Sequence, residues 1–252
     1  LLQDPLVEIE FPNEDELDGN DFIYKLRKSG YEKGEHVPLA VKKKIAKELH
    51  CDYFMFGNIA FEDSNFLIES KIFNVINGKL VSENSKNSPD YFSLIDHFSL
   101  QFKKDIDIPS SHIEEIENIP FSEITTESKD AYKQFIEGIL TKEHENDYEN
   151  SIKSLKEATK NDPTFSLANF SLSWVAFLSN NEEYTSYKDQ SMNDALAHLY
   201  KLPARLSFLI KMHNYFFHKG DAEKAVKVIQ MWKRQYPNSL SPNMSLGRIY
   251  QR

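Results

Sequence analysis

The stretch from residue 206 to residue 250 constrains the fold of this chain more than any other, because it repeats a pattern of helix, turn and helix. Gly220-Asp221 suits the turn between two apolar helical segments, and Pro237 ends the second of them. Counting on by one period of 34 residues starts a new unit at Leu240. In that unit the positions where such a repeat carries Leu, Gly and Tyr are filled by Leu246, Gly247 and Tyr250.

This pattern resembles the tetratricopeptide repeat, in which stacked helical hairpins bury a continuous core and form a curved array. A weaker copy upstream ends at Asp162-Pro163, and Phe165 to Phe177 opens a further unit that carries an insertion before residue 206. We therefore predict an all-α helical repeat array over residues 127–252, with three repeats and the start of a fourth. On this register the core positions of residues 206–239 are Leu209, Phe216, Ala225, Ile229 and Trp232.

The first helix of each repeat is expected to face the concave side of the array, where repeat proteins bind their partners. The side chains predicted to bind a protein or peptide partner there are Phe170, Trp174, Asn214, His218 and Arg248. The same register places Tyr132, Phe135 and Phe177 on this surface. The alternative is that the aromatic side chains pack between helices.

The first hundred residues predict a small α+β domain with its helices on one face of a sheet. Asn77-Gly78 favours a type I′ hairpin turn, and the polar run 84–88 indicates a loop. The residues expected to share one face of the long strand are Phe66, Ile68, Ile72 and Ile76. The expected elements are strands at 6–11, 53–59, 66–76 and 79–83, and helices at 21–29, from Pro38 onward, and at 90–104.

These elements suggest an α+β domain at residues 1–107, a linker at 108–126, and the repeat array at 127–252. The α+β stretch resembles the TolB-amino-terminal-like or FlgO-like domain in three features: a helix ending at Leu49 to Asp52, a strand ending in Gly57, and a hairpin turn at Asn77-Gly78. The segments that follow, Thr126 to Tyr132 and Asp162-Pro163, are similar to those found after this domain in bacterial signalling proteins.

This resemblance implies a regulatory module of a larger protein and no catalytic residues. We therefore expect a non-catalytic interaction module, with a small-molecule sensor near Gly57 and Asn77 as the alternative. The chain begins without Met, which suggests that it is a fragment. Its sequence does not indicate a compartment.

The composition of the 252 residues excludes several classes of protein and of functional site. A formal charge of −9 argues against a general nucleic-acid-binding face. The single cysteine, Cys51, excludes an internal disulfide, and no apolar run is long enough to span a membrane. Phosphate loops, metal-binding clusters and nucleophile elbows are missing from the sequence. We expect no cofactor and no metal.

A cluster of lysines interrupts this acidic composition in the helix after Pro38, at Lys42, Lys43, Lys44 and Lys47. Two interpretations remain open. The cluster is either an ordinary solvated helix face or a patch that binds an anionic partner.

Overall fold

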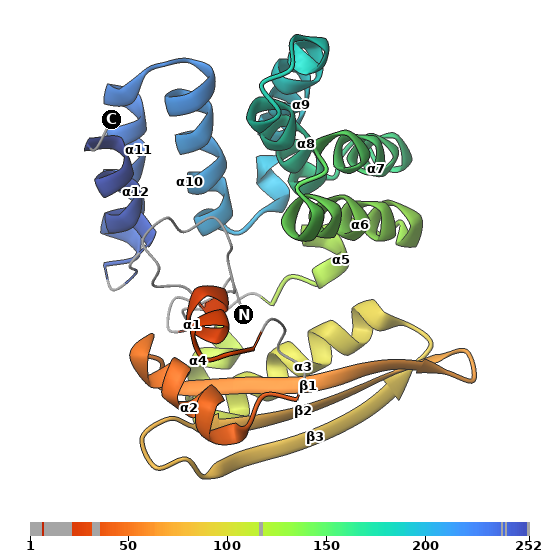
Figure 1. Cartoon of the computed structure of the whole chain (residues 1–252), viewed down its shortest axis with the longest axis vertical. Helices are drawn as coiled ribbons and strands as arrows, with labels where there is room; N and C mark the ends of the chain where they lie inside the picture. Colours follow the sequence, from red (N-terminus) through yellow and green to blue (C-terminus); the bar gives the residue numbers. More distant parts are fainter. Residues whose placement is uncertain are drawn as a thin grey trace. The chain divides into compact units, whose positions relative to one another are not determined.

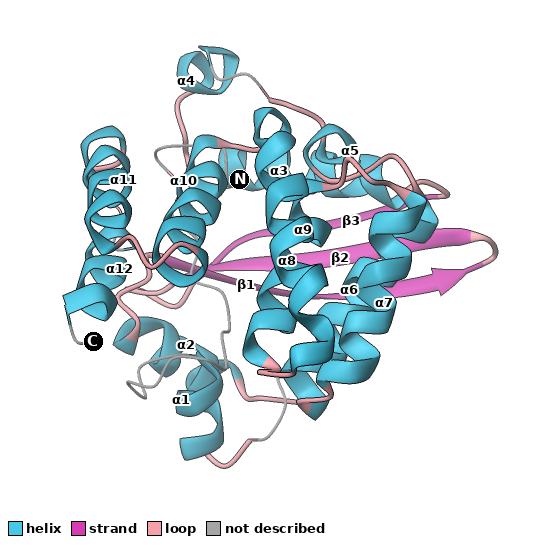
Figure 2. Cartoon of the chain, turned by 90° about the horizontal axis from the view of Figure 1, so that it is seen from above, coloured by secondary structure: helices cyan, strands magenta, loops and turns pink. Residues whose placement is uncertain are grey.

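The computed structural model describes residues 7, 22–31, 36–115, 118–237, 239 and 241–250 (Figures 1 and 2). The chain divides into two compact units, Ile9–Glu117 and Asn118–Arg252, and the second unit also includes Leu2–Glu8. The first unit is α+β and the second is helical. The strand expected at residues 6–11 lies outside the described residues except for Val7, whose carbonyl accepts a 2.8 Å hydrogen bond from Arg205 Nη1.

The described strands of the first unit form one antiparallel sheet in the order β1-β2-β3. Asp63 and Ser64 connect the first two strands, and both have positive φ, at 48° and 64°. This is the backbone that a type I′ turn requires. The strands are β1 (Tyr53–Glu62), β2 (Asn65–Asn74) and β3 (Leu80–Ser88).

The connection between β2 and β3 differs from the type I′ turn predicted at Asn77-Gly78. It spans residues 75–79, and of its residues only Gly78 has a positive φ. Asn77 stays out of the left-handed region because its backbone N–H donates to Asn74 Oδ1 at 3.1 Å. Ile76 therefore projects from this connection with 84% of its surface exposed, and does not continue the strand face as expected.

The prediction that the helices share one face of the sheet is wrong. Phe54, Phe56 and Phe73 stack on one face, where Lys42 of α2 (Leu39–Glu48) lies over the Phe56 ring at 3.6 Å. The other face contacts α3 (Tyr91–Asp105), for example where Tyr91 meets Phe66. The apolar run in β1 has no polar face: Phe54 and Phe56 join the ring stack, whereas Met55, Ile59 and Phe61 on the other side are exposed apolar side chains.

The polar loop predicted at residues 84–88 is instead part of β3. Ser82 Oγ and Asn84 Nδ2 donate to Asp105 Oδ2 of α3 at 2.7 and 2.8 Å. Polar side chains therefore join this edge strand to its helix, so the strand lacks the apolar alternation by which strands are recognised.

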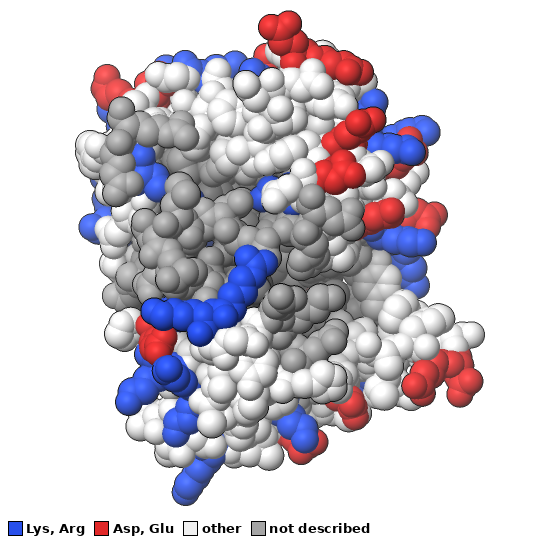
Figure 3. All heavy atoms as spheres, viewed as in Figure 1, with Lys and Arg blue, Asp and Glu red and all other residues white. Residues whose placement is uncertain are grey.

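Two short helices form a small core beside the sheet. Leu26 of α1 (Phe22–Lys28) packs with Val37 and with Ile45 of α2, and all three are buried. Lys25, Arg27 and Lys28 of α1 and the lysines of α2 are basic, and Lys and Arg atoms gather over this part of the unit in Figure 3. The linker predicted at 108–126 contains two short helices, α4 (Ser110–Glu115) and α5 (Phe121–Ile124).

The second unit consists of successive helical hairpins. Ser128, Asp147 and Asp221 cap the amino ends of α6, α7 and α11 by accepting backbone N–H bonds. The α-helices are α6 (Lys129–Glu145), α7 (Tyr148–Asn161), α8 (Ser166–Leu178), α9 (Thr185–Ala197), α10 (Ala204–His213), α11 (Ala222–Gln235) and α12 (Ser241–Tyr250). Residues 206–239 thus contain a helical pair, as the sequence predicted.

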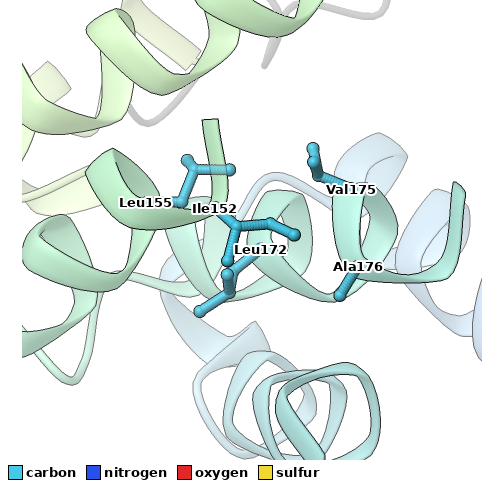
Figure 4. Close-up of a cluster of buried hydrophobic side chains, with 5 residues drawn as sticks. All are labelled: Ile152, Leu155, Leu172, Val175 and Ala176. Carbon is cyan, nitrogen blue, oxygen red and sulfur yellow. The ribbon is translucent and has the colours of Figure 1, made fainter. Parts of the chain in front are cut away.

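Apolar clusters connect neighbouring hairpins. One cluster joins α7 to α8, and Figure 4 shows its five buried side chains, Ile152, Leu155, Leu172, Val175 and Ala176. Another joins α9 to α10 through Met192, Ala195, Leu202 and Ile210. Successive hairpins of this unit are therefore joined by separate apolar clusters. Among the described residues, no helix is long and apolar enough to cross a membrane.

Candidate functional site

A cluster of aromatic rings fills the space between α8 and α10. Trp174 lies at the centre, with its ring centroid 4.7 Å from that of His213 and 4.9 Å from that of Phe217. Phe170 contacts His213 at 5.2 Å, and Phe177 stacks on Trp174 at 5.3 Å. Phe170, Trp174 and Phe177 follow helical spacing along α8, so they form one stripe facing α10.

The helix beyond α10 widens into a π-helical turn, Asn214–His218. Its closing hydrogen bond runs from the backbone N–H of Lys219 to the carbonyl of Asn214 at 3.0 Å. π-turns inside helices occur frequently at functional sites. His213, which precedes the turn, occupies the position that Gly247 holds 34 residues later.

His218 is held by a serine from α8. Ser173 Oγ donates a 2.6 Å hydrogen bond to the carbonyl of Lys188, and its oxygen lies 3.4 Å from His218 Nε2. Because the serine hydrogen is used in the shorter bond, Nε2–H of His218 must be the donor in the longer one. Nδ1 lies 3.6 Å from a carboxylate oxygen of Asp189, with which it forms an ion pair when the ring is protonated.

Three buried polar atoms in this segment have no hydrogen-bond partner within the described part of the chain: His213 Nδ1, Asn214 Oδ1 and His218 Nδ1. The His218 side chain is only 2% exposed. Buried polar atoms in folded proteins are nearly always hydrogen-bonded. Three such exceptions within six residues therefore distinguish this turn from an ordinary packing contact.

The pKa of each imidazole lies below its ordinary value. Burial is the largest cause that lowers the pKa of His213 to about 4, and the neighbouring His218 and Arg248 contribute to the same shift. Burial also lowers the pKa of His218, an effect that Asp189 opposes. The site therefore favours neutral imidazoles beside its aromatic rings, with one cation, Arg248, close enough to influence His213.

The structure brings together four of the five side chains predicted to bind a partner. Phe170, Trp174 and His218 belong to the ring cluster, and Asn214 lies buried on the π-turn. Arg248 is exposed on α12. Phe177 joins the same cluster. Tyr132 instead packs against Phe121 of α5, and Phe135 packs against Phe165 at the start of α8, as the alternative of packing between helices describes.

Reasoning from the sequence missed His213, Phe217, Ser173 and Asp189. His213 carried a usable signal, because a large polar side chain stood at a glycine position of the repeat. The sequence around the other three residues contains no feature that distinguishes them from ordinary surface or core residues.

The other places where a ligand was expected or a groove occurs have fewer features of a binding site. A polar groove of about 340 Å³ lies between α6 and α7, lined by Gln134, Glu137, Thr141, Asn150, Lys153, Ser154 and Glu157. Gly57 sits against the backbone of Glu69, and Asn77 lies in the exposed connection after β2. No group of three His, Cys, Asp or Glu side chains placed to hold a metal ion occurs among the described residues.

Comparison with known proteins adds no further assignment. The chain matches no protein-family model, no curated protein sequence and no solved structure.

Proposed function

We propose that the second unit is a tetratricopeptide-type repeat array that binds a protein or peptide partner along α8, α10 and α12 and catalyses no reaction. Three successive hairpins support this proposal: α6–α7, α8–α9 and α10–α11. The next helix, α12, begins where the 34-residue period starts again. The apolar clusters that join neighbouring hairpins agree with an array whose repeats stabilise one another.

The single observation that carries the binding proposal is the set of unpartnered atoms on and beside the π-turn. A buried polar atom without a hydrogen bond costs about 1–3 kcal/mol. In the free protein His213 Nδ1 and Asn214 Oδ1 have no such bond, and the group nearest to His218 Nδ1 is the Asp189 carboxylate at 3.6 Å. A partner that supplies hydrogen bonds to these atoms removes this cost on binding, so the bound state gains stability at this turn.

The chemistry of these atoms indicates what the partner presents. Asn214 Oδ1 is an acceptor, so the partner must supply an N–H or O–H donor. Trp174 beside them favours an apolar side chain. The exposed guanidinium of Arg248 favours an acidic group. A peptide segment with an amide donor next to an apolar and an acidic residue meets these three requirements.

We also propose that the first unit is a TolB-amino-terminal-like or FlgO-like domain, so that the chain is a regulatory module of a larger signalling protein. The order of elements supports this proposal. Helix α2 ends just before Cys51-Asp52, β1 carries Gly57, and the β2–β3 hairpin follows.

Peptides selected from a random display library on the full chain test the binding proposal. We expect their Kd, measured by fluorescence anisotropy, to weaken about tenfold or more for Asn214→Ala and Arg248→Ala, since hydrogen bonds to charged or buried groups contribute roughly 1.5–3 kcal/mol. Gln134→Ala and Lys153→Ala in the α6–α7 groove are the matched controls and should bind like the unmodified chain. Peptides that respond only to the two controls contradict the proposal.

A further inference from the structure

One end of the first unit combines lysines with exposed aliphatic side chains. On α2, Leu39, Lys43 and Lys47 recur every four residues and therefore share one side of the helix. The opposite side of α2 is buried through Ile45 and Ala46. Leu39 is 43% exposed although it is apolar. This side of α2 therefore presents an apolar residue, Leu39, in its first turn and two lysines in the turns that follow.

The connection between β2 and β3 meets this side of α2. A Cβ built on Gly78 would lie 2.7 Å from Lys43 Nζ, so the ammonium group rests directly on the turn. Next to Gly78 are Lys79 and two apolar side chains, Ile76 at 84% and Leu80 at 48% exposure. Leu80 pairs with Phe73, on the sheet face that Lys42 of α2 covers. We call Leu39, Lys43, Lys47, Ile76, Lys79 and Leu80 the basic tip.

The lysines of the basic tip carry uncompensated charge. Glu48 is the acidic residue of α2, and it is occupied by Lys25 at 3.3 Å and Lys44 at 3.9 Å. Within the described ranges, no acidic side chain pairs with Lys43, Lys47 or Lys79. This concentration of positive charge stands out on a chain whose formal charge is −9.

We propose that the basic tip docks on an anionic lipid bilayer, with the lysines against lipid phosphates and Ile76 and Leu80 inserted at the headgroup level. Charge complementarity supplies the anionic partner. The exposed aliphatic side chains select a bilayer over a nucleic acid, because an interface of headgroups and acyl chains accepts both cations and apolar groups. Aromatic rings for stacking on bases, which single-stranded nucleic acids require, are not part of the tip.

Vesicle flotation with the full chain tests this proposal. We expect the protein to float with vesicles of phosphatidylcholine mixed with phosphatidylglycerol and not with phosphatidylcholine alone. Each lysine near such a surface contributes about a fivefold change in partitioning, so K43Q/K47Q/K79Q should weaken it on the order of 100-fold. Lys133, Lys153 and Lys211 are exposed lysines of the second unit, and the triple variant K133Q/K153Q/K211Q is the charge-matched control that should float normally.

A second variant separates insertion from charge. Ile76→Ser removes an exposed side chain and should weaken partitioning about tenfold, while its dependence on salt stays that of the unmodified chain. Flotation that is equal on neutral vesicles, or that is lost equally in the control triple variant, overturns the proposal. Binding of single-stranded nucleic acid through the tip lysines, with no flotation on anionic vesicles, would assign the surface to a different partner and also overturns it.

Discussion

Ser151 on α7 donates a 2.7 Å hydrogen bond through its hydroxyl to the backbone carbonyl of Gly138 on α6. Both residues are buried at the crossing of the two helices. The absence of a side chain at Gly138 allows this contact, because a Cβ there would lie 2.7 Å from Leu155 Cγ and 3.1 Å from the Ser151 carbonyl oxygen. In the first hairpin a side chain of α7 is therefore hydrogen-bonded directly to the backbone of α6.

Replacing Gly138 by alanine should destabilise the second unit although alanine is the better helix former. We expect a loss of about 1–3 kcal/mol, the usual cost of overpacking a core. The two tryptophans, Trp174 and Trp232, both lie in this unit, so urea unfolding followed by tryptophan fluorescence reports on it selectively.

Gly247 provides the control for that variant, since nothing lies within 4 Å of a Cβ built there. Gly247→Ala should be neutral or stabilise by up to about 1 kcal/mol through helix propensity. Equal unfolding midpoints for both alanine variants would show that the Gly138 contact does not hold the hairpin together.

Gly57 allows β1 and β2 to approach closely, and its replacement should disrupt the sheet. An alanine Cβ at this position would lie 1.8 Å from the carbonyl oxygen of Glu69. We expect Gly57→Ala to cost about 3 kcal/mol or more, because backbone must move to admit the methyl group. Cys51, the only cysteine, lies just before β1, so the urea dependence of its labelling by a thiol reagent reports on this unit.

The matched control is Gly30→Asn. Gly30 has a φ of 87° and open space around its Cβ position, and asparagine tolerates a left-handed backbone better than other residues. Its thiol-labelling profile should stay near that of the unmodified chain. Protection of Cys51 that is unchanged in Gly57→Ala would be inconsistent with the close strand pairing.

The stability of the second unit should depend on pH through His213. Its pKa falls from 6.5 to about 4 on folding, so the folded state binds the proton less readily than the unfolded state. Above pH 6.5 His213 is neutral in both states and the unit has its full stability. As the pH falls from 6.5 toward 4, the unfolded state binds a proton that the folded state does not, and the free energy of unfolding decreases. The size of this loss is about 3 kcal/mol.

Urea unfolding at pH values between 7 and 4 measures this effect for the unmodified chain and for His213→Phe, which keeps a ring and cannot be protonated. The phenylalanine variant should lose less stability across that interval. His50→Gln removes an exposed imidazole of the first unit and should leave the pH dependence of the second unit intact. Parallel curves for the unmodified chain and His213→Phe would exclude this role of His213.

The helical hairpins could be predicted because the spacing of small residues, turns and prolines recurs with a fixed period around residues 206–250. The end of β2 and the strand β3 could not, for two local reasons. The β2–β3 connection has a positive φ only at Gly78, so Asn77-Gly78 does not form the hairpin turn that its sequence favours. The polar side chains of β3 bond to Asp105 of α3, so this strand lacks the apolar alternation from which strands are normally inferred.

The candidate site shows a similar limit. Periodicity placed Trp174 and His218 on first helices, but the contact of Trp174 with His213 depends on how far apart α8 and α10 lie. The π-turn from Asn214 to His218 likewise carries no pattern that separates it from an ordinary helix. The unpartnered atoms emerge only when the side chains around them are placed.

Amide hydrogen exchange of the full chain, with and without a selected peptide, tests the central claim most directly. If a partner binds along the first helices, exchange should slow at residues 170–177, at 214–218 and around Arg248, and remain unchanged at 134–157 in the α6–α7 hairpin. Protection confined to 134–157, or to the first unit, would contradict binding at the π-turn.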